Sequence, residues 1–211
     1  FIRTVATVTR WLEHIGIKPG DKIAIIFPNS VEWYTVFWAA VALGARPIPL
    51  DPQIGEWELK QFFALMEFKA CFIIPKYRAN PLAANIKSTI KGLKKKPVIC
   101  IANDNKNETS FFKWADVIEE PSEGLLASEV QEDPEGLLMY ACTSGTTGNP
   151  KIISVDHSGF YRAQKDMAEY LELSPRDTML LGMPLYHQGG FGMGVQAVLS
   201  CTTVIYQPQF S

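Results

Sequence analysis

The sequence has 211 residues, an apolar content of 47% and a formal net charge of −2. This length suits one large α/β domain or two small ones. The near-neutral charge gives no general basic field, which argues against broad electrostatic binding to nucleic acid. Four cysteines, Cys71, Cys100, Cys142 and Cys201, are widely scattered without CxxC spacing. That pattern favours reduced thiols in a cytoplasmic protein over a disulfide framework or a zinc site.

The two ends of the chain fall within or close to predicted elements. The sequence begins without a methionine, and Val5, Val8 and Leu12 already share one face of a predicted helix from Phe1 to His14. At the other end, residues 202–206 predict a strand with only a few residues after it. We therefore expect residues 1–211 to be a piece of a longer protein.

The first half of the chain alternates between strand-like and helix-like segments. Strands are predicted over residues 22–27, 46–52, 71–75 and 97–102, and helices over residues 31–43, 56–68, 82–93 and 111–118. Repeated alternation of this kind predicts parallel strands joined by right-handed helical crossovers. The expected fold class is α/β, with mostly parallel sheets and helices on both faces.

The helix over residues 31–43 has two informative features. Asn29, followed three residues later by Glu32, has the spacing of a capping box and predicts that Asn29 caps this helix. The helix itself is apolar nearly all round, which is typical of a buried helix. It is too short to span a membrane, since a span needs about 20 apolar residues.

Charged segments precede and follow the helix predicted over residues 111–118. The lysine-rich run of residues 91–96 is most simply a solvated helix end, although nucleic-acid binding is an alternative. Residues 119–135 form an acidic linker, which we interpret as the boundary between two layers of one domain. Adjacent carboxylates in such a loop do not by themselves make a metal site.

The segment from Met139 to Lys151 is an apolar run that ends in small hydroxylated residues, glycines and a lysine. Its candidate anion-binding residues are Thr143, Ser144, Gly145, Thr146, Thr147, Gly148 and Lys151. Glycines let backbone N–H groups approach an anion, hydroxyls add neutral donors, and the lysine adds a positive charge. The spacing is neither GxxxxGK[ST] nor GxGxxG. The composition therefore predicts either a polyphosphate loop or an ordinary surface turn.

The order of residues in this loop favours a polyphosphate loop over an ordinary surface turn. Residues 144–151, Ser-Gly-Thr-Thr-Gly-Asn-Pro-Lys, resemble the phosphate-binding signature of the adenylate-forming superfamily, which includes acyl-CoA and aryl-CoA synthetases, peptide-synthetase adenylation domains and firefly luciferases. One departure is Ile152, since the superfamily usually has a glycine after the loop lysine. Strands over residues 136–141 and 152–155 are predicted to flank the loop, at a sheet edge where ligands of α/β folds bind.

A second resemblance lies in residues 184–187, Pro-Leu-Tyr-His, between a predicted strand at residues 178–183 and a predicted helix at residues 191–199. It is similar to the segment of acyl-CoA and aryl-CoA synthetases whose histidine borders the acyl pocket and moves between the two half-reactions. His187 therefore favours a CoA ligase over an amino-acid adenylation domain. His157, which opens a predicted helix to residue 171, is more simply a helix-start residue than a base.

The resemblance implies ATP-dependent activation of a carboxylic acid, with an acyl-adenylate and then a CoA thioester as products. ATP, Mg²⁺ and CoA are the implied cofactors and substrates, Lys151 and His187 the implied catalytic residues, and no metal ligand is assigned. The implied activity belongs to fatty acid metabolism. The family's adenine-binding, ribose-binding and C-terminal catalytic segments have no counterpart, so residues 1–211 are expected to be a partial N-terminal AMP-binding domain that lacks the C-terminal domain.

Two other hypotheses stay open on the sequence. One is that the isolated chain is a non-catalytic fragment that binds nucleotide weakly. Alternatively, Cys142 with His157 or His187 as a base has the skeleton of a cysteine hydrolase, although a cysteine that ends a buried strand is normally inert.

Overall fold

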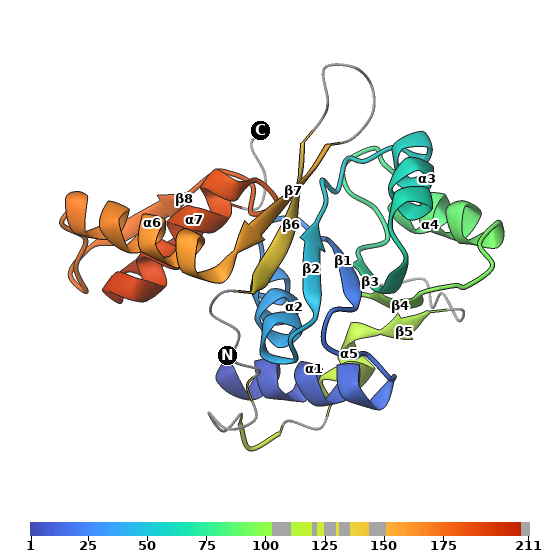
Figure 1. Ribbon diagram of the computed structural model, residues 1–211, viewed down its shortest axis with the longest axis horizontal. Helices are drawn as coiled ribbons and strands as arrows, with labels where there is room; N and C mark the ends of the chain where they lie inside the picture. Colours follow the sequence, from blue (N-terminus) through green and yellow to red (C-terminus); the bar gives the residue numbers. More distant parts are fainter. Residues whose placement is uncertain (103–110, 120–121, 125–129, 131–135, 144–150, 208–211) are drawn as a thin grey trace.

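The computed structural model describes residues 1–102, 111–119, 122–124, 130, 136–143 and 151–207. Its centre is a parallel sheet with the strand order β2-β1-β3-β4-β5 (Figure 1). The strands are β1 (Lys22–Ile26), β2 (Arg46–Pro49), β3 (Phe68–Ile73), β4 (Val98–Ile101) and β5 (Phe112–Lys113). Four residues of β1, from Ile23 to Ile26, are fully buried, as expected for a central strand covered on both faces.

Helices cover both faces of this sheet. They are α1 (Ile2–His14), α2 (Val31–Ala42), α3 (Glu56–Leu65), α4 (Leu82–Lys91) and α5 (Trp114–Val117). Helix α1 packs against α2 and α5, whereas α3 packs against α4. Trp11 of α1 meets Phe72 and Phe112 edge to face, with ring centroids 5.8 and 5.6 Å apart, which fixes α1 over the sheet. The predicted α/β class with parallel strands is confirmed.

Several predicted boundaries are wrong: the strand predicted over residues 71–75 lies at Phe68–Ile73, and the helix predicted over residues 191–199 begins at Gln188. The helix predicted over residues 56–68 ends at Leu65, because the backbone of Met66 is already extended at φ −130° and ψ 128°. Phe68 instead begins β3, where it pairs with Lys22 and is 4% exposed. In addition, the helix predicted over residues 111–118 begins as the short strand β5.

The second part of the chain begins with an antiparallel hairpin. Strand β6 (Leu137–Thr143) pairs with β7 (Lys151–Asp156), and β6 lies beside β2 at the edge of the parallel sheet. Figure 1 shows the hairpin running alongside β2, with the end of β6 and the start of β7 on the side to which the β2 arrow points. The predicted pair of strands around the loop is confirmed.

A βαβ unit follows the hairpin. Helix α6 (His157–Tyr170) packs beside α7 (Gln188–Ser200), and α7 joins the parallel strands β8 (Thr178–Leu181) and β9 (Thr203–Tyr206). Phe191 of α7 is 1% exposed and stacks with Phe160 of α6 at 5.1 Å. The same ring lies 4.3 Å from Phe37 and 5.7 Å from Trp33, so this aromatic cluster joins the unit to α2.

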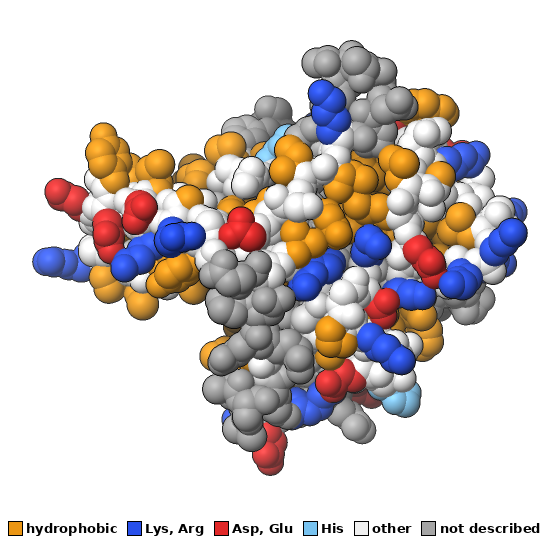
Figure 2. Space-filling view, in the orientation of Figure 1, with side chains coloured by type: hydrophobic (Ala, Val, Ile, Leu, Met, Phe, Trp, Pro, Cys, Tyr) orange, Lys and Arg blue, Asp and Glu red, His pale blue; other side chains and the backbone are white. Residues whose placement is uncertain are grey.

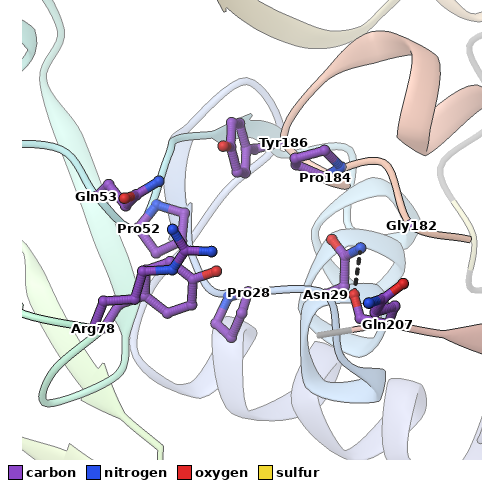
Figure 3. Close-up of a pocket in the computed structure, with 10 residues that line it drawn as sticks. Pro28, Asn29, Pro52, Gln53, Arg78, Gly182, Pro184, Tyr186 and Gln207 are labelled. Atoms are coloured by element: carbon purple, nitrogen blue, oxygen red, sulfur yellow. Dashed lines mark hydrogen bonds between the residues drawn. The ribbon is translucent and has the colours of Figure 1, made fainter. Parts of the chain in front are cut away.

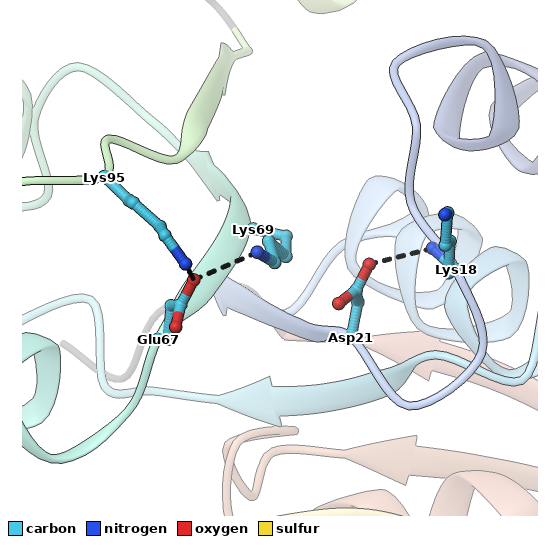
Figure 4. Close-up of polar contacts among 5 residues, drawn as sticks. All are labelled: Lys18, Asp21, Glu67, Lys69 and Lys95. Carbon is cyan, nitrogen blue, oxygen red and sulfur yellow. Dashed lines mark hydrogen bonds and ion pairs between the residues drawn. The ribbon is translucent and has the colours of Figure 1, made fainter.

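The surface in Figure 2 mixes charged and apolar side chains. Near the amino ends of the strands, Glu67 accepts from Lys69 at 3.0 Å and from Lys95 at 3.1 Å (Figure 4). These side chains are 41–75% exposed, so the pairs contribute little to stability. Lys95 is thus exposed to solvent, which agrees with the interpretation of residues 91–96 as a solvated helix end. Within the described ranges, no helix is both long and apolar enough to cross a membrane.

Candidate functional site

The hairpin brings together the two ends of the candidate phosphate loop. Thr143 is the last residue of β6, and its Cα is the register partner of Lys151, the first residue of β7. Lys151 is exposed. Ser144, Gly145, Thr146, Thr147 and Gly148 lie outside the described residues, together with Asn149 and Pro150. The register therefore places Lys151 beside Thr143, and Figure 1 shows the start of β7 on the side to which the β2 arrow points.

His187 lies at the other candidate position, after strand β8. The His187 N–H donates to the Pro184 carbonyl at 3.1 Å, so residues 184–187 form a tight turn. His187 is then the N-cap of α7, since its carbonyl accepts from Phe191 N–H at 3.0 Å, but its side chain makes no capping bond. Its imidazole is exposed and lies 4.8 Å from the ring of Tyr186.

His157 does not share the loop's position. It is the first residue of α6, directly after β7, and its N–H donates to the Gly136 carbonyl at 3.0 Å. Because β7 runs away from Lys151, His157 lies roughly 20 Å along the strand from that lysine. This agrees with the interpretation of His157 as a helix-start residue.

Asn29 corrects one sequence prediction. Helix α2 is capped by Ser30, whose hydroxyl accepts from Trp33 N–H at 3.2 Å, and not by Asn29. The Asn29 amide instead donates to the carbonyls of Met183 at 2.9 Å and Gln207 at 3.3 Å. Its Oδ1 accepts from Leu185 N–H at 2.8 Å. The predicted capping box was wrong because a hydroxyl one residue later satisfies the helix start and leaves Asn29 for distant backbone groups.

A small pocket lies next to this network (Figure 3). Its volume is about 130 Å³, and its lining residues all follow the carboxyl ends of parallel strands: Pro28, Asn29, Pro52, Gln53, Tyr77, Arg78, Gly182, Pro184, Tyr186 and Gln207. Ligands of open α/β sheets bind at such ends. The volume is below the range of about 300–1,000 Å³ for ligand pockets, so this space by itself does not hold a nucleotide.

Tyr186 links the 184–187 turn to the parallel sheet. Its hydroxyl lies near the carboxylate of Asp51, which follows β2, and burial together with that negative charge raises the pKa of Tyr186. Asp51 also accepts from Gln53 N–H at 2.7 Å. Arg78, near this pair, has an unusual φ of 53°. The sequence analysis missed this cluster, although the ends of predicted parallel strands were a usable signal.

Three of the four cysteines, Cys71, Cys100 and Cys142, are buried or half-buried, whereas Cys201 is exposed. Cys142 is half-buried in β6, and burial raises its pKa to about 12. Burial likewise raises the pKa of Cys100 to about 12. A thiol with such a pKa is almost entirely protonated at neutral pH, whereas a cysteine nucleophile must be a thiolate. This speaks against the cysteine hydrolase. Across the described ranges, no group of three His, Cys, Asp or Glu side chains could hold a metal ion.

The fold and the position of the loop define a family. The family model for AMP-binding enzymes matches residues 2–211, and the chain belongs to this family. Long-chain-fatty-acid–CoA ligase FadD13 of Mycobacterium tuberculosis is 28% identical over 203 residues, which are 94% of this chain and 37% of the relative. The putative acyl-CoA synthetase YngI of Bacillus subtilis is 26% identical over 90% of this chain and 37% of its own length.

Solved structures agree on the fold. The N-terminal domain of FACL13 from Mycobacterium tuberculosis has a TM-score of 0.79 at 24% identity and covers 99% of this chain and 49% of that one. Acetoacetyl-CoA synthetase from Streptomyces lividans has a TM-score of 0.84 at 20% identity and covers 97% of this chain and 32% of that one. The chain therefore spans well under half of the length of the curated relatives that it matches.

Proposed function

We propose that the protein to which this chain belongs activates a carboxylic acid with ATP, forming an acyl-adenylate and pyrophosphate and then a CoA thioester. In this proposal, residues 1–211 are the N-terminal part of its AMP-binding domain, and the segment 119–135 is an internal linker. The acid is of the class used by the fatty-acyl relatives, and the protein acts in the cytoplasm. Membership of the AMP-binding family, with acid–CoA ligases among the relatives, supports the proposal.

The chemistry needs charge to be neutralised on the departing pyrophosphate. The acid's carboxylate oxygen attacks the α-phosphorus of ATP, and the bond from that phosphorus to the β-phosphate bridge oxygen breaks. Donors aimed at the β- and γ-phosphates stabilise this transition state. We assign this role to Thr143, Ser144, Gly145, Thr146, Thr147 and Gly148, with Lys151 as the cation. Mg²⁺ is proposed to enter as the ATP complex, so this chain needs no metal ligand of its own.

In the second half-reaction the CoA thiolate attacks the acyl carbonyl, and AMP leaves with the electron pair of the broken acyl–oxygen bond. We assign to His187 a place beside the acyl group. Its exposed imidazole follows the carboxyl end of β8, where a bound acid would lie in an α/β sheet. This assignment favours CoA as the acceptor over the carrier of an amino-acid adenylation domain.

One observation carries the proposal most directly. Thr143 and Lys151 are register partners at the end of the hairpin, which lies alongside β2 at the carboxyl edge of the parallel sheet. An exposed lysine next to the loop is suited to a polyphosphate, because a compact ammonium supplies a point charge to phosphate oxygens.

The test is carboxylate-dependent exchange of radioactive pyrophosphate into ATP, with fatty, aryl and amino acids as separate substrates. We expect exchange with a fatty or aryl acid in the longest natural form of the protein. Exchange with amino acids alone would overturn the assignment to CoA ligases, and no exchange with any acid would overturn adenylation. The same assay on residues 1–211 tests whether this segment alone is a non-catalytic fragment, which predicts nucleotide binding without exchange.

A further inference from the structure

The side chain of Asn29 connects three backbone groups that are distant in the sequence. Its amide donates to the carbonyls of Met183 and Gln207, and its Oδ1 accepts from Leu185 N–H. Asn29 itself is 7% exposed and Leu185 is 1% exposed. Figure 3 shows the Asn29 amide pointing from the end of β1 towards Gln207. All the hydrogen-bonding atoms of this side chain are therefore used to hold the segments that follow β8 and β9.

The turn held by Asn29 is the turn that ends at His187. Leu185 is its second residue, between Pro184, which accepts the closing bond, and His187, which donates it. Helix α7 also packs against the turn so closely that a β-carbon on Gly190 would overlap the Pro184 carbonyl. Asn29 and the first turn of α7 thus both contact the turn of residues 184–187.

Removal of the Asn29 side-chain amide should disturb the turn of residues 184–187 more than other parts of the structure. A buried N–H without a partner costs much more than the net gain of one hydrogen bond, so Leu185 would have to move to find water or another acceptor. Because the turn is only four residues long, a shift at Leu185 carries His187 with it. Displacement of a catalytic group by about 1 Å can reduce a rate by roughly 100-fold.

We propose that Asn29 is a positioning residue for His187, acting through the Leu185 N–H to fix the turn at the carboxyl edge of the sheet. This inference rests on the proposed function only for its catalytic consequence. The mechanical part, that Asn29 sets the conformation of residues 184–187, stands on the hydrogen bonds alone.

The test compares Asn29→Ala with Asn80→Ala. Asn80 is a matched control, because its amide also donates to two carbonyls, those of Pro52 and Ile54 at 2.9 Å each, and its Oδ1 accepts one bond from Asn85 at 2.8 Å. None of these partners belongs to the turn of residues 184–187. We would measure hydrogen exchange at the Leu185 amide and the NMR chemical shifts of the His187 imidazole in both variants.

In Asn29→Ala we expect faster exchange at Leu185 and changed chemical shifts of the His187 imidazole, and in Asn80→Ala neither change. In the ligase assay, Asn29→Ala should lower kcat/KM for the acid by roughly 10- to 100-fold with little change in KM for ATP. A merely structural role would lower the active fraction and leave both KM values unchanged. If Asn29→Ala does not fold, Asn29→Ser should show the same changes at smaller size, since its hydroxyl and a bridging water can satisfy part of the network.

Equal effects of Asn29→Ala and Asn80→Ala on Leu185 and His187 would overturn the inference. So would an Asn29→Ser variant in which the Leu185 amide exchanges faster but the chemical shifts of the His187 imidazole do not change. If the wild-type protein activates no acid, the proposed function fails, while the exchange and NMR measurements still decide whether Asn29 positions the turn.

Discussion

The phenol of Tyr34 in α2 fills the space beside Gly194 in α7 that a β-carbon would need. Tyr34 is 4% exposed, and its ring also lies 5.5 Å from that of Tyr206 in β9. The packing of the βαβ unit on α2 therefore depends on a glycine at position 194 of α7. This contact, together with the hydrogen bonds of Asn29, joins the β8–α7–β9 unit to the part of the chain that contains β1 and α2.

Gly194→Ala should destabilise the fold by about 2 kcal/mol, because overpacking of a closed interface typically costs about 1–3 kcal/mol. Chemical denaturation measures this change in the free energy of unfolding. Gly192→Ala in the same helix is the control. There a β-carbon would meet the amide end of Gln164 at 2.6 Å, a flexible side chain that can turn away, and the gain in helix propensity offsets part of the loss. Equal losses for the two variants would contradict this account of the interface.

Lys151→Met should reduce pyrophosphate exchange by roughly 100-fold, because removing one group that stabilises transition-state charge typically costs a factor of about 100–1,000. The measurement is kcat/KM for ATP in the exchange assay. Lys165→Met is the matched control, since Lys165 lies in α6 and forms an exposed pair with Glu169 at 3.7 Å. The assignment of Lys151 would be wrong if both variants kept wild-type exchange.

The cap of α6 should make stability depend on acid pH. Asp156 accepts from Gly159 N–H at 2.6 Å and from the Ser158 hydroxyl at 3.2 Å, and these bonds hold its pKa below its ordinary value of 3.8. Because its pKa is lowered, the carboxylate stabilises the folded state above pH 3.8. This contribution is lost as the pH falls through the folded-state pKa.

Asp156→Asn tests this cap, because Asn caps helices about as well as Asp but does not titrate. We expect the wild type to be the more stable protein near neutral pH and the advantage to vanish as the pH falls through the lowered pKa of Asp156. Thermal unfolding at a series of pH values gives the comparison. Asp166→Asn, in the middle of the same helix, should show no such acid-dependent difference, and a similar difference there would assign the effect to net charge.

Alkylation should distinguish the four cysteines. Cys201 is exposed at the end of α7, whereas Cys142 is half-buried with its pKa raised to about 12, and Cys71 and Cys100 are buried. Because the thiolate is the reactive form, iodoacetamide near neutral pH should modify Cys201 first, as followed by peptide mass spectrometry.

Cys142→Ser extends the same test to function. An adenylating enzyme should keep its activity in this variant, while a cysteine hydrolase would lose it. Preferential modification of Cys142 in the native protein would contradict the burial that the fold gives to this thiol.

Local sequence patterns determined much of this protein. The alternation of apolar runs and helical periods predicted the parallel sheet and its crossovers, since burial of β1 and α2 requires nearly continuous apolar residues. The order of residues 144–151 indicated the AMP-binding family, which the family model confirms. The loop's function stays a prediction, because Ser144 to Pro150 lie outside the described residues.

Tertiary structure decided what local patterns left ambiguous. Asn29 and Ser30 could each cap α2, and the choice depended on Met183, Leu185 and Gln207, which are more than 150 residues away and whose backbone groups need partners once buried. The local sequence around Phe68 is compatible with a helix or a strand, and the pairing of Phe68 with Lys22 of β1 places it in the sheet. Hydrogen bonds between distant segments have no periodic signature in a sequence, so the positioning of His187 could only be seen after folding had brought those segments together.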